Sequence, residues 1–283
     1  MIRLIVISIS ILLLSGCASV VENSLATQAQ RLSSAMQNHE DPETVIQAMP
    51  SYLLLLDSLA EQPDAGRKTL ISASSMYTAY SSLLSDQNLR VQRLTSHSLN
   101  YANRALCLDL PDLCITLEAP FAQFEQEIQS LDFNGHTDVL YNYVQTLGLW
   151  IQARTDNWDA LAKVARVRLL SEKLYAIDKT MDKGGLSAIL GLLNSLLPPS
   201  YGGKPEVARD FFEKSIVISQ QENLSYKVMF AQFYARLVFD QDLHDKLLKE
   251  VIAADAGAGN NRVVNILAQK QAAKLLEQSS EYF

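Results

Sequence analysis

The sequence predicts an all-α protein built as an array of antiparallel helical hairpins. From Glu22 to the end of the chain, runs rich in Leu, Ala, Gln, Glu and Lys place apolar residues at the 3.6-residue period of a helix. No segment shows the sustained alternation of apolar and polar residues that indicates a half-buried β-strand. A degenerate repeat in the second half of the chain favours the hairpin arrangement over an irregular bundle.

The helices expected in the first half follow from local start and stop signals. Asp41-Pro42-Glu43 is a typical helix start, and Gln62-Pro63-Asp64 is a typical break. Between them Pro50 should kink or break the helix, because proline lacks a backbone N–H and crowds the preceding turn. The expected helices are, in order, Glu22 to Gln37, Pro42 to Ala60, Ala65 to Leu84, Asn88 to Cys107 and Glu118 to Ser130.

The clearest helix of the second half follows the turn Gly202-Gly203. Pro205 suits the first helical position, and Glu206 complements the helix dipole. The stretch from Leu186 to Leu197 is too short to cross a membrane, and Pro198-Pro199 ends it, so we expect a buried or ligand-facing helix. A last helix is expected from Arg262 to about Gln278.

A degenerate repeat relates the helices between residues 138 and 255. Val144-x2-Leu147-Gly148-x2-Ile151 has the pattern of the first helix of a tetratricopeptide unit, and Leu190-Gly191 and Phe230-Ala231-x2-Tyr234 repeat its centre. The small residues are 43 and then 40 residues apart, more than the standard period of about 34. Each of these patterns, taken alone, also fits an ordinary amphipathic core helix. Because the spacings agree and small residues let helices approach closely, the pattern favours tetratricopeptide-like hairpins.

Residues 1–16 are predicted to be a lipoprotein signal peptide. Arg3 is followed by an apolar run from Leu4, which ends in Leu14-Ser15-Gly16-Cys17. The alternative, a transmembrane anchor, needs about twenty apolar residues, and this run is shorter. Cys17 would then carry the lipid and begin a single domain, residues 17–283, at the periplasmic face of the cell envelope. Ala18 after the cysteine favours the outer membrane.

Cys107 and Cys114 remain as a pair once Cys17 is assigned to the lipid. In an oxidising compartment they could form a disulfide, because Pro111 could turn the chain back and bring the two Cα atoms within roughly 4.4–6.8 Å. The alternative is two buried free thiols that act as small apolar residues.

Charge and motifs exclude several classes of function. The chain carries 24 lysines and arginines against 31 aspartates and glutamates, which argues against a nucleic-acid partner. Its four histidines are scattered singly and lack cysteine partners, so we expect no metal site. Neither a Gly-x-Ser-x-Gly elbow nor a phosphate-binding glycine loop is present. We therefore expect no cofactor, no catalytic residues and no enzymatic activity.

Aromatic residues are the best candidates for a ligand or partner surface. They come from several repeat units, and helical arrays present concave surfaces where such side chains can form a groove or pore. The alternative is that most of them belong to the core. Two leucines of the apolar stretch after Leu186 are expected to contact a ligand or line a pore. The full candidate set is Tyr141, Trp150, Leu190, Leu193, Tyr201 and Tyr234.

Nearly all of the chain after Cys17 resembles the T component of tripartite ATP-independent periplasmic (TRAP) transporters, the TatT-like lipoproteins. The most specific segments are Gly202-Gly203-Lys204-Pro205-Glu206 with the helix after it, Tyr234-Ala235-Arg236-Leu237-Val238, and Asn265-x-Leu267-Ala268-Gln269. The resemblance implies a lipid-anchored, all-helical periplasmic protein with cryptic tetratricopeptide-like repeats. It also implies a homotrimer with a pore through each subunit, docked to a periplasmic substrate-binding protein and passing hydrophobic ligands.

Two functions of different classes follow. The leading hypothesis is a non-enzymatic, lipid-anchored accessory component of a TRAP-type transport system that passes or stores small hydrophobic ligands. The alternative is a tetratricopeptide-like scaffold lipoprotein for envelope protein assembly, because such grooves usually hold peptides and a fold does not decide function. A third function, an envelope hydrolase, would need a nucleophile and a base of which the sequence gives no sign.

Overall fold

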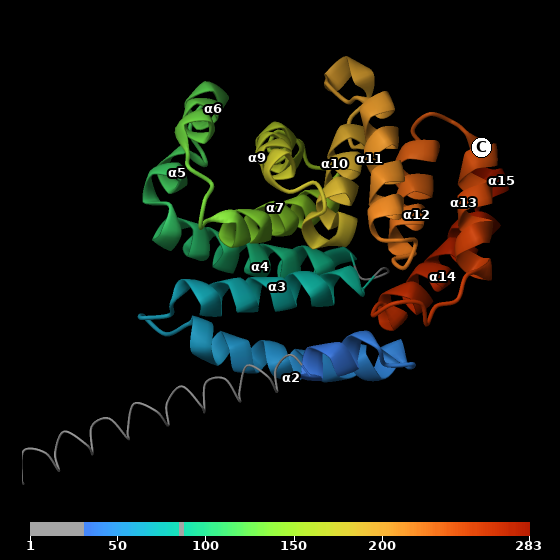
Figure 1. Ribbon diagram of the computed structural model, residues 1–283, viewed down its shortest axis with the longest axis horizontal. Coiled ribbons are helices and arrows are strands. Elements are labelled where there is room, and N and C mark those ends of the chain that lie inside the picture. Colours follow the sequence, from blue (N-terminus) through green and yellow to red (C-terminus); the bar gives the residue numbers. More distant parts are fainter. Residues whose placement is uncertain (1–30, 85–87) are drawn as a thin grey trace, which may run out of the picture.

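The computed structural model describes residues 31–84 and 88–283, and throughout these ranges every regular element is a helix (Figure 1). The predicted all-α class is therefore confirmed. Residues 31–37 are helical, whereas the predicted signal peptide and Cys17 lie outside the described residues. The N-terminal half continues with α2 (Pro42–Ala60), α3 (Arg67–Ser82), α4 (Asn88–Asp109), α5 (Pro111–Thr116), α6 (Phe121–Ser130) and α7 (Thr137–Gln152).

The C-terminal half is also helical but more often interrupted. A 3-10 turn at Met181–Gly184 precedes α10, another at Pro199–Tyr201 follows it, and a π-helix, Phe230–Ala235, directly continues α12. No described helix is both long enough and apolar enough to cross a membrane. The α-helices of this half are α8 (Trp158–Leu161), α9 (Val164–Ile177), α10 (Gly185–Ser195), α11 (Pro205–Ile218), α12 (Ser225–Met229), α13 (Gln241–Ala253), α14 (Arg262–Glu277) and α15 (Ser279–Tyr282).

Helix α2 shows how local signals and tertiary packing share control of an element. Its first turn is capped by Asp41, whose carboxylate accepts from the backbone N–H of Glu43 at 3.0 Å. The helix continues through Pro50 without interruption. The expectation that this proline would break the helix is therefore wrong. Met49 and Leu53 are buried on either side of the proline, and this burial holds both halves of α2 on the core.

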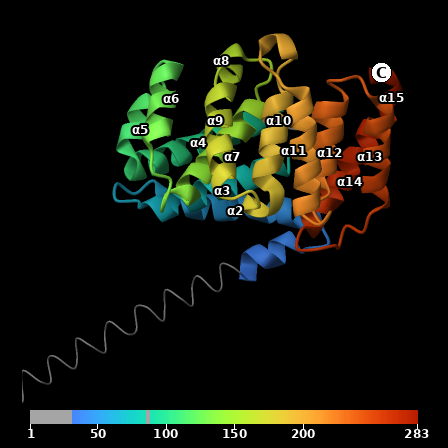
Figure 2. The same cartoon turned by 45° about the horizontal axis from the view of Figure 1, so that its top comes forward.

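Helices close in sequence pack side by side. Helix α2 packs on α3, α3 on α4, α10 on α11, and α13 on α14, while α7 contacts α3, α4, α9 and α10 (Figures 1 and 2). At Gly191 a Cβ atom would lie only 2.9 Å from the ring of Phe212, so the approach of α10 to α11 requires glycine there. The assignment of such pairs to tetratricopeptide-like repeats stays a prediction.

The apolar interior consists of two clusters. The N-terminal cluster is built from α2 to α10 together with Val263 of α14, and it includes Tyr101 and Phe124. The C-terminal cluster extends from α10 to α14 and includes Phe212 and Leu248. Helix α14 packs back against α2. The late helices thus contact the N-terminal half along α10 and also at α2.

Candidate functional site

A pocket of about 450 Å³ lies where the ends of α3, α4 and α7 face α12, the π-helix and α14; we call it the inter-helix pocket. Its apolar wall includes Leu84, Leu149, Met229, Phe233 and Leu267. Its polar groups are neutral amides and hydroxyls, and none of the described residues that line it is charged. Pockets of this size with a few convergent polar groups are typical small-molecule sites.

The π-helix determines which side chains reach the inter-helix pocket. Here the N–H of Arg236 donates to the carbonyl oxygen of Ala231, five residues earlier, at 3.3 Å. The wider turn leaves Gln232 and Phe233 on the pocket wall, while Phe230 stacks on Phe212 in the core at 5.4 Å between ring centroids. Single turns of π-helix are rare and occur often at functional sites.

Two glutamines join opposite elements of the inter-helix pocket. The Gln271 Nε2 amide on α14 donates to the Gln232 Oε1 on the π-helix at 2.8 Å. A third lining amide, Gln152, comes from the last turn of α7. Each amide can donate and accept, so together they suit a ligand with a neutral polar group.

The charge of the pocket lining limits the ligand class. A buried ion without a partner of opposite charge is strongly disfavoured relative to water. Because the described lining supplies no such partner, the inter-helix pocket suits an uncharged molecule with an apolar body and a hydrogen-bonding end.

A second cavity, of about 280 Å³, lies between α8, α9 and the turn before α11; we call it the aromatic pocket. Trp158 and Tyr201 flank it with ring centroids 5.8 Å apart, and they are 67% and 64% exposed. Arg168 Nη1 fixes the turn by donating to the Gly202 carbonyl oxygen at 3.0 Å. A Cβ on Gly203 would collide with the carbonyl oxygen of Leu197, so this turn requires glycine.

The structure disperses the predicted surface residues rather than bringing them together. Leu190 and Leu193 are fully buried in the N-terminal cluster, and neither lines one of the cavities described here. Tyr234 is mostly buried and lies 5.2 Å from the Phe230 ring, between centroids. Of the six candidates, Tyr201 lines one of the two cavities described above, the aromatic pocket.

The other two predicted aromatics are held by polar neighbours. The Tyr141 hydroxyl donates to Asp182 Oδ2 at 2.6 Å, and burial together with this carboxylate raises the pKa of Tyr141, so the hydroxyl remains a donor. Trp150 is half-buried, with the Arg154 guanidinium 4.5 Å above its ring. Both side chains are thus committed to contacts within the protein.

Sequence reasoning missed the three glutamines of the inter-helix pocket, and it grouped Trp158 with the other aromatics of the array but left it out of the final candidate set. Gln232 lies inside Phe230-Ala231-x2-Tyr234, which was recognised only as the centre of a repeat. The shift from α-helix to π-helix has no sequence signature, so the direction of Gln232 was not predictable. Trp158 begins α8 directly after the Asn157 helix cap, as its place at a helix start in the sequence indicated.

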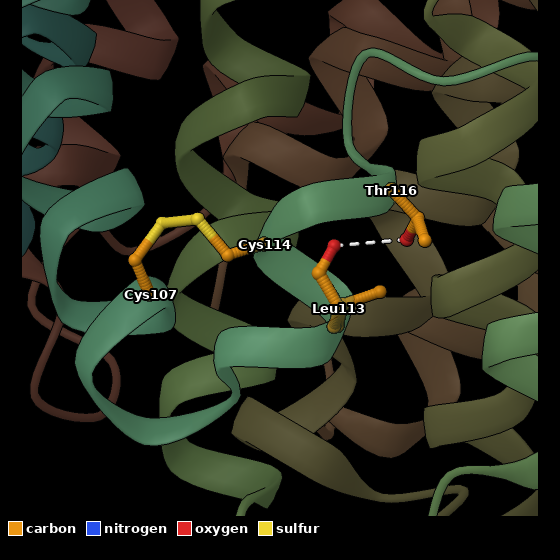
Figure 3. The surroundings of a disulfide bond; sticks show 4 residues. All are labelled: Cys107, Leu113, Cys114 and Thr116. Atoms are coloured by element: carbon orange, nitrogen blue, oxygen red, sulfur yellow. Dashed lines mark hydrogen bonds between the residues drawn. A yellow bond between two sulfur atoms is a disulfide. The ribbon is translucent and has the colours of Figure 1, made fainter.

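The structure contains a disulfide between Cys107 and Cys114, whose Cα atoms are 4.9 Å apart (Figure 3). It links the last turns of α4 to the short helix α5. Within the described ranges, no group of three or more His, Cys, Asp or Glu side chains could hold a metal ion.

Comparison with known proteins identifies one family. A family model described as TRAP transporter T-component matches residues 38–283, a range that contains both the inter-helix pocket and the aromatic pocket. No curated protein matches the chain. The family match covers far more than half of the sequence and agrees with the resemblance that the motifs indicated. The chain therefore belongs to the TRAP transporter T-component family.

Proposed function

We propose that the protein is a non-enzymatic accessory component of a TRAP-type transport system that stores or passes a small uncharged ligand in the inter-helix pocket. Family membership supports the link to a TRAP transporter system. The observation that carries the ligand part is the pocket itself, with an apolar wall, paired amides and no charged group among its described lining residues. The ligand's apolar body packs against residues such as Met229 and Phe233, and its polar end meets Gln232 and Gln271.

The aromatic pocket is the surface we assign to docking of the periplasmic substrate-binding protein. Exposed tryptophan and tyrosine next to an apolar hollow are the residue types that contribute most to protein interfaces. Trp158 and Tyr201 meet this description and flank a cavity lined by Leu161, Val164 and Leu197. According to this proposal, a side chain of the substrate-binding protein fills the aromatic pocket.

The location and assembly belong to the same proposal. Cys17 carries the lipid and holds the protein at the periplasmic face of the outer membrane, as the signal motif predicts. The protein works as a homotrimer, which the family resemblance implies.

The first test identifies ligands that stay bound when the lipidated protein is gently extracted from its native membrane. We expect mass spectrometry to find an uncharged small molecule. Gln232→Glu should lose it, because glutamate still accepts from Gln271 but places a charge in the pocket. Gln129→Glu, on the exposed face of α6, makes the same chemical change outside the pocket and should keep the ligand. Equal retention by both variants would contradict the assignment.

The same extraction tests docking. A periplasmic substrate-binding protein should co-purify with the wild type and be lost from the double variant Trp158→Ser, Tyr201→Ser, which still carries the ligand. If the partner is instead an envelope-assembly protein and the pocket is empty, the scaffold function replaces the transport function.

A further inference from the structure

We propose that an open trough along α4 binds an acidic segment of a partner protein. The trough has a volume of about 500 Å³ and is formed by α4 together with Arg154, just beyond α7; we call it the α4 trough. Arg93, Ser96, His97 and Asn100 line it at the spacing i, i+3, i+4, i+7, which places them on one face of the helix. Because a helix rises 1.5 Å per residue, this row extends about 10 Å.

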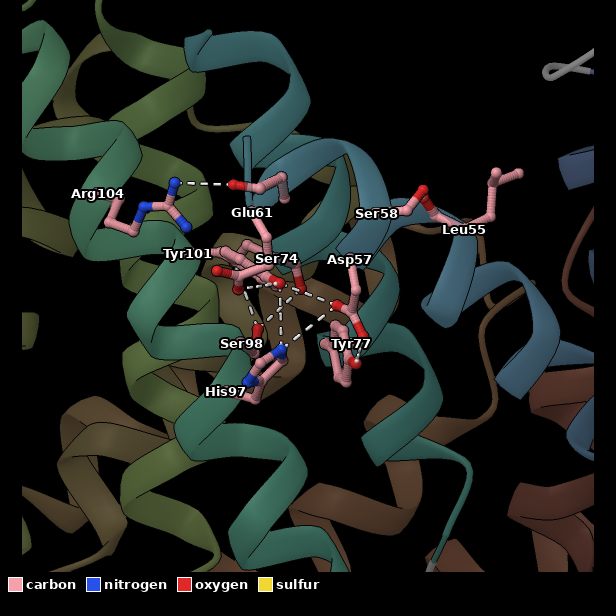
Figure 4. A network of polar contacts seen from close by, with 11 residues as sticks. Leu55, Asp57, Ser58, Glu61, Ser74, Tyr77, His97, Ser98, Tyr101 and Arg104 are labelled. Carbon is pink, nitrogen blue, oxygen red and sulfur yellow. Dashed lines mark hydrogen bonds and ion pairs between the residues drawn. The ribbon is translucent and has the colours of Figure 1, made fainter. Parts of the chain in front are cut away.

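The α4 trough is basic in an acidic protein. The formal net charge of the chain is −7, yet no aspartate or glutamate occurs from Asn88 to Leu108. The trough residue His97 contacts one carboxylate, that of Asp57 on α2. The Asp57 carboxylate accepts hydrogen bonds from the hydroxyls of Tyr77 at 2.7 Å and Tyr101 at 2.9 Å, and His97 Nε2 lies 3.3 Å away (Figure 4). This carboxylate is committed to its own partners.

Arg154 supplies a fixed positive charge at the edge of the trough. Its Nη1 donates to Thr95 Oγ1 and to the Trp150 carbonyl oxygen, both at 3.0 Å. Its Nη2 donates to Ser96 Oγ at 2.7 Å and to the Gln92 carbonyl oxygen, and its guanidinium lies 4.5 Å from the Trp150 ring centroid. The position of the charge is therefore set before any partner arrives.

These contacts leave the Ser96 hydroxyl free to donate a hydrogen bond. Its oxygen accepts from Arg154 Nη2 and from Trp150 Nε1 at 3.2 Å, which occupies both lone pairs. The hydroxyl hydrogen is then available to a group outside the protein. Arg93 and Asn100 are exposed, and their side chains make no hydrogen bond or ion pair within the described part of the chain. The trough therefore presents donors in a row.

The shape of the trough favours a segment with several carboxylates over a single small anion. Arg93 and Asn100 are two helical turns apart, so one small ion cannot meet both of them. Carboxylate side chains spaced along a peptide can meet both and can also accept from Ser96. Charge complementarity of this kind raises association rates and specificity between proteins.

The test uses the full chain in non-ionic detergent and a fluorescently labelled short peptide of glutamate and serine. Fluorescence anisotropy at low salt should show binding that weakens as salt is added, whereas the matched glutamine and serine peptide should not bind. Arg93→Glu should weaken binding about tenfold. Lys68→Glu, an equal charge change on exposed α3 surface, should change it by less than about twofold.

Three outcomes would overturn the proposal. The acidic peptide fails to bind, the neutral peptide binds as well, or the two charge-reversal variants weaken binding equally, which would indicate only a response to net charge. Circular dichroism of both variants verifies that the helices are intact, and the peptide tests do not depend on any ligand of the inter-helix pocket.

Discussion

Asp109 shows how a single residue joins three parts of the chain. Its Oδ2 lies 2.8 Å from Arg67 Nη1 at the start of α3 and 2.6 Å from His136 Nδ1 before α7. Partial burial raises the pKa of the Asp109 carboxyl, but hydrogen bonds from His136 and Arg67 outweigh it, and the net pKa is lowered. The ionised form of this carboxylate therefore stabilises the folded protein.

Replacing Asp109 with asparagine should cost stability in a pH-dependent way. Because the folded pKa is below the unfolded one, the carboxylate contributes stability above about pH 4, and the contribution is lost as pH falls through the folded pKa. Asp109→Asn should lower the free energy of unfolding by about 1 kcal/mol near pH 7 and by much less near pH 3. Urea unfolding at both pH values measures this difference.

The matched control is Asp64→Asn, which changes an exposed carboxylate in the loop before α3. It should leave the free energy of unfolding nearly unchanged at both pH values. A loss in Asp109→Asn that is the same at low and neutral pH would show that packing, rather than the carboxylate charge, is responsible.

For single residues, the sequence predicted which residue types are important better than it predicted where their side chains point. The apolar run around Leu190 and Leu193 predicted a buried or ligand-facing helix, and the structure buries both leucines. The helical period alone could not decide between burial and ligand contact, because nearly every face of α10 is apolar. The outcome depends on which helices surround α10. Gln232 shows the opposite case, because this polar residue beside core aromatics lines a pocket from within a π-helix that the sequence did not predict.

Elements were most predictable where prolines and caps act locally. The starts of α2 at Pro42 and α11 at Pro205 are confirmed, because these signals operate within one turn. The start of α6 is three residues later than expected, after Pro120, and the short α5 was missed. Helix α5 has only six residues, too few for a periodic pattern, and its position depends on tertiary contacts and on the link to Cys107.

The disulfide between α4 and α5 gives a prediction about these two elements. Cross-linking cysteines seven residues apart restricts the unfolded chain, and the entropy of so short a loop corresponds to about 2.5 kcal/mol. The double variant Cys107→Ser, Cys114→Ser should therefore unfold at lower urea concentration than the wild type. Adding a reductant should lower the wild-type midpoint and leave the variant unchanged.

Thiol alkylation can show whether the disulfide is absent. In unfolded but unreduced protein, Cys107 and Cys114 should resist alkylation and appear as a linked peptide by mass spectrometry. Alkylation of both cysteines without reductant would instead favour the pair of free thiols.

At the scale of the whole molecule, α10 connects the two apolar clusters. Leu186, Leu190 and Leu193 belong to the N-terminal cluster, whereas Leu192 belongs to the C-terminal one. The packing of α14 on α2 provides a second connection, so neither half buries its apolar surface alone. The sequence predicted a single domain because no long linker was found, and this mutual burial is the physical reason to expect one unfolding unit.

One unfolding unit has a measurable consequence, because both tryptophans, Trp150 and Trp158, lie in α7 and α8. Leu248→Ala removes buried volume from α13 in the C-terminal cluster and should cost about 3 kcal/mol. If the clusters unfold together, tryptophan fluorescence and far-ultraviolet circular dichroism shift to the same lower urea midpoint. Val217→Ala, on an exposed side chain, should shift neither signal. If tryptophan fluorescence keeps the wild-type midpoint while circular dichroism shows an earlier step, the C-terminal cluster unfolds on its own, and residues 17–283 contain two units rather than one.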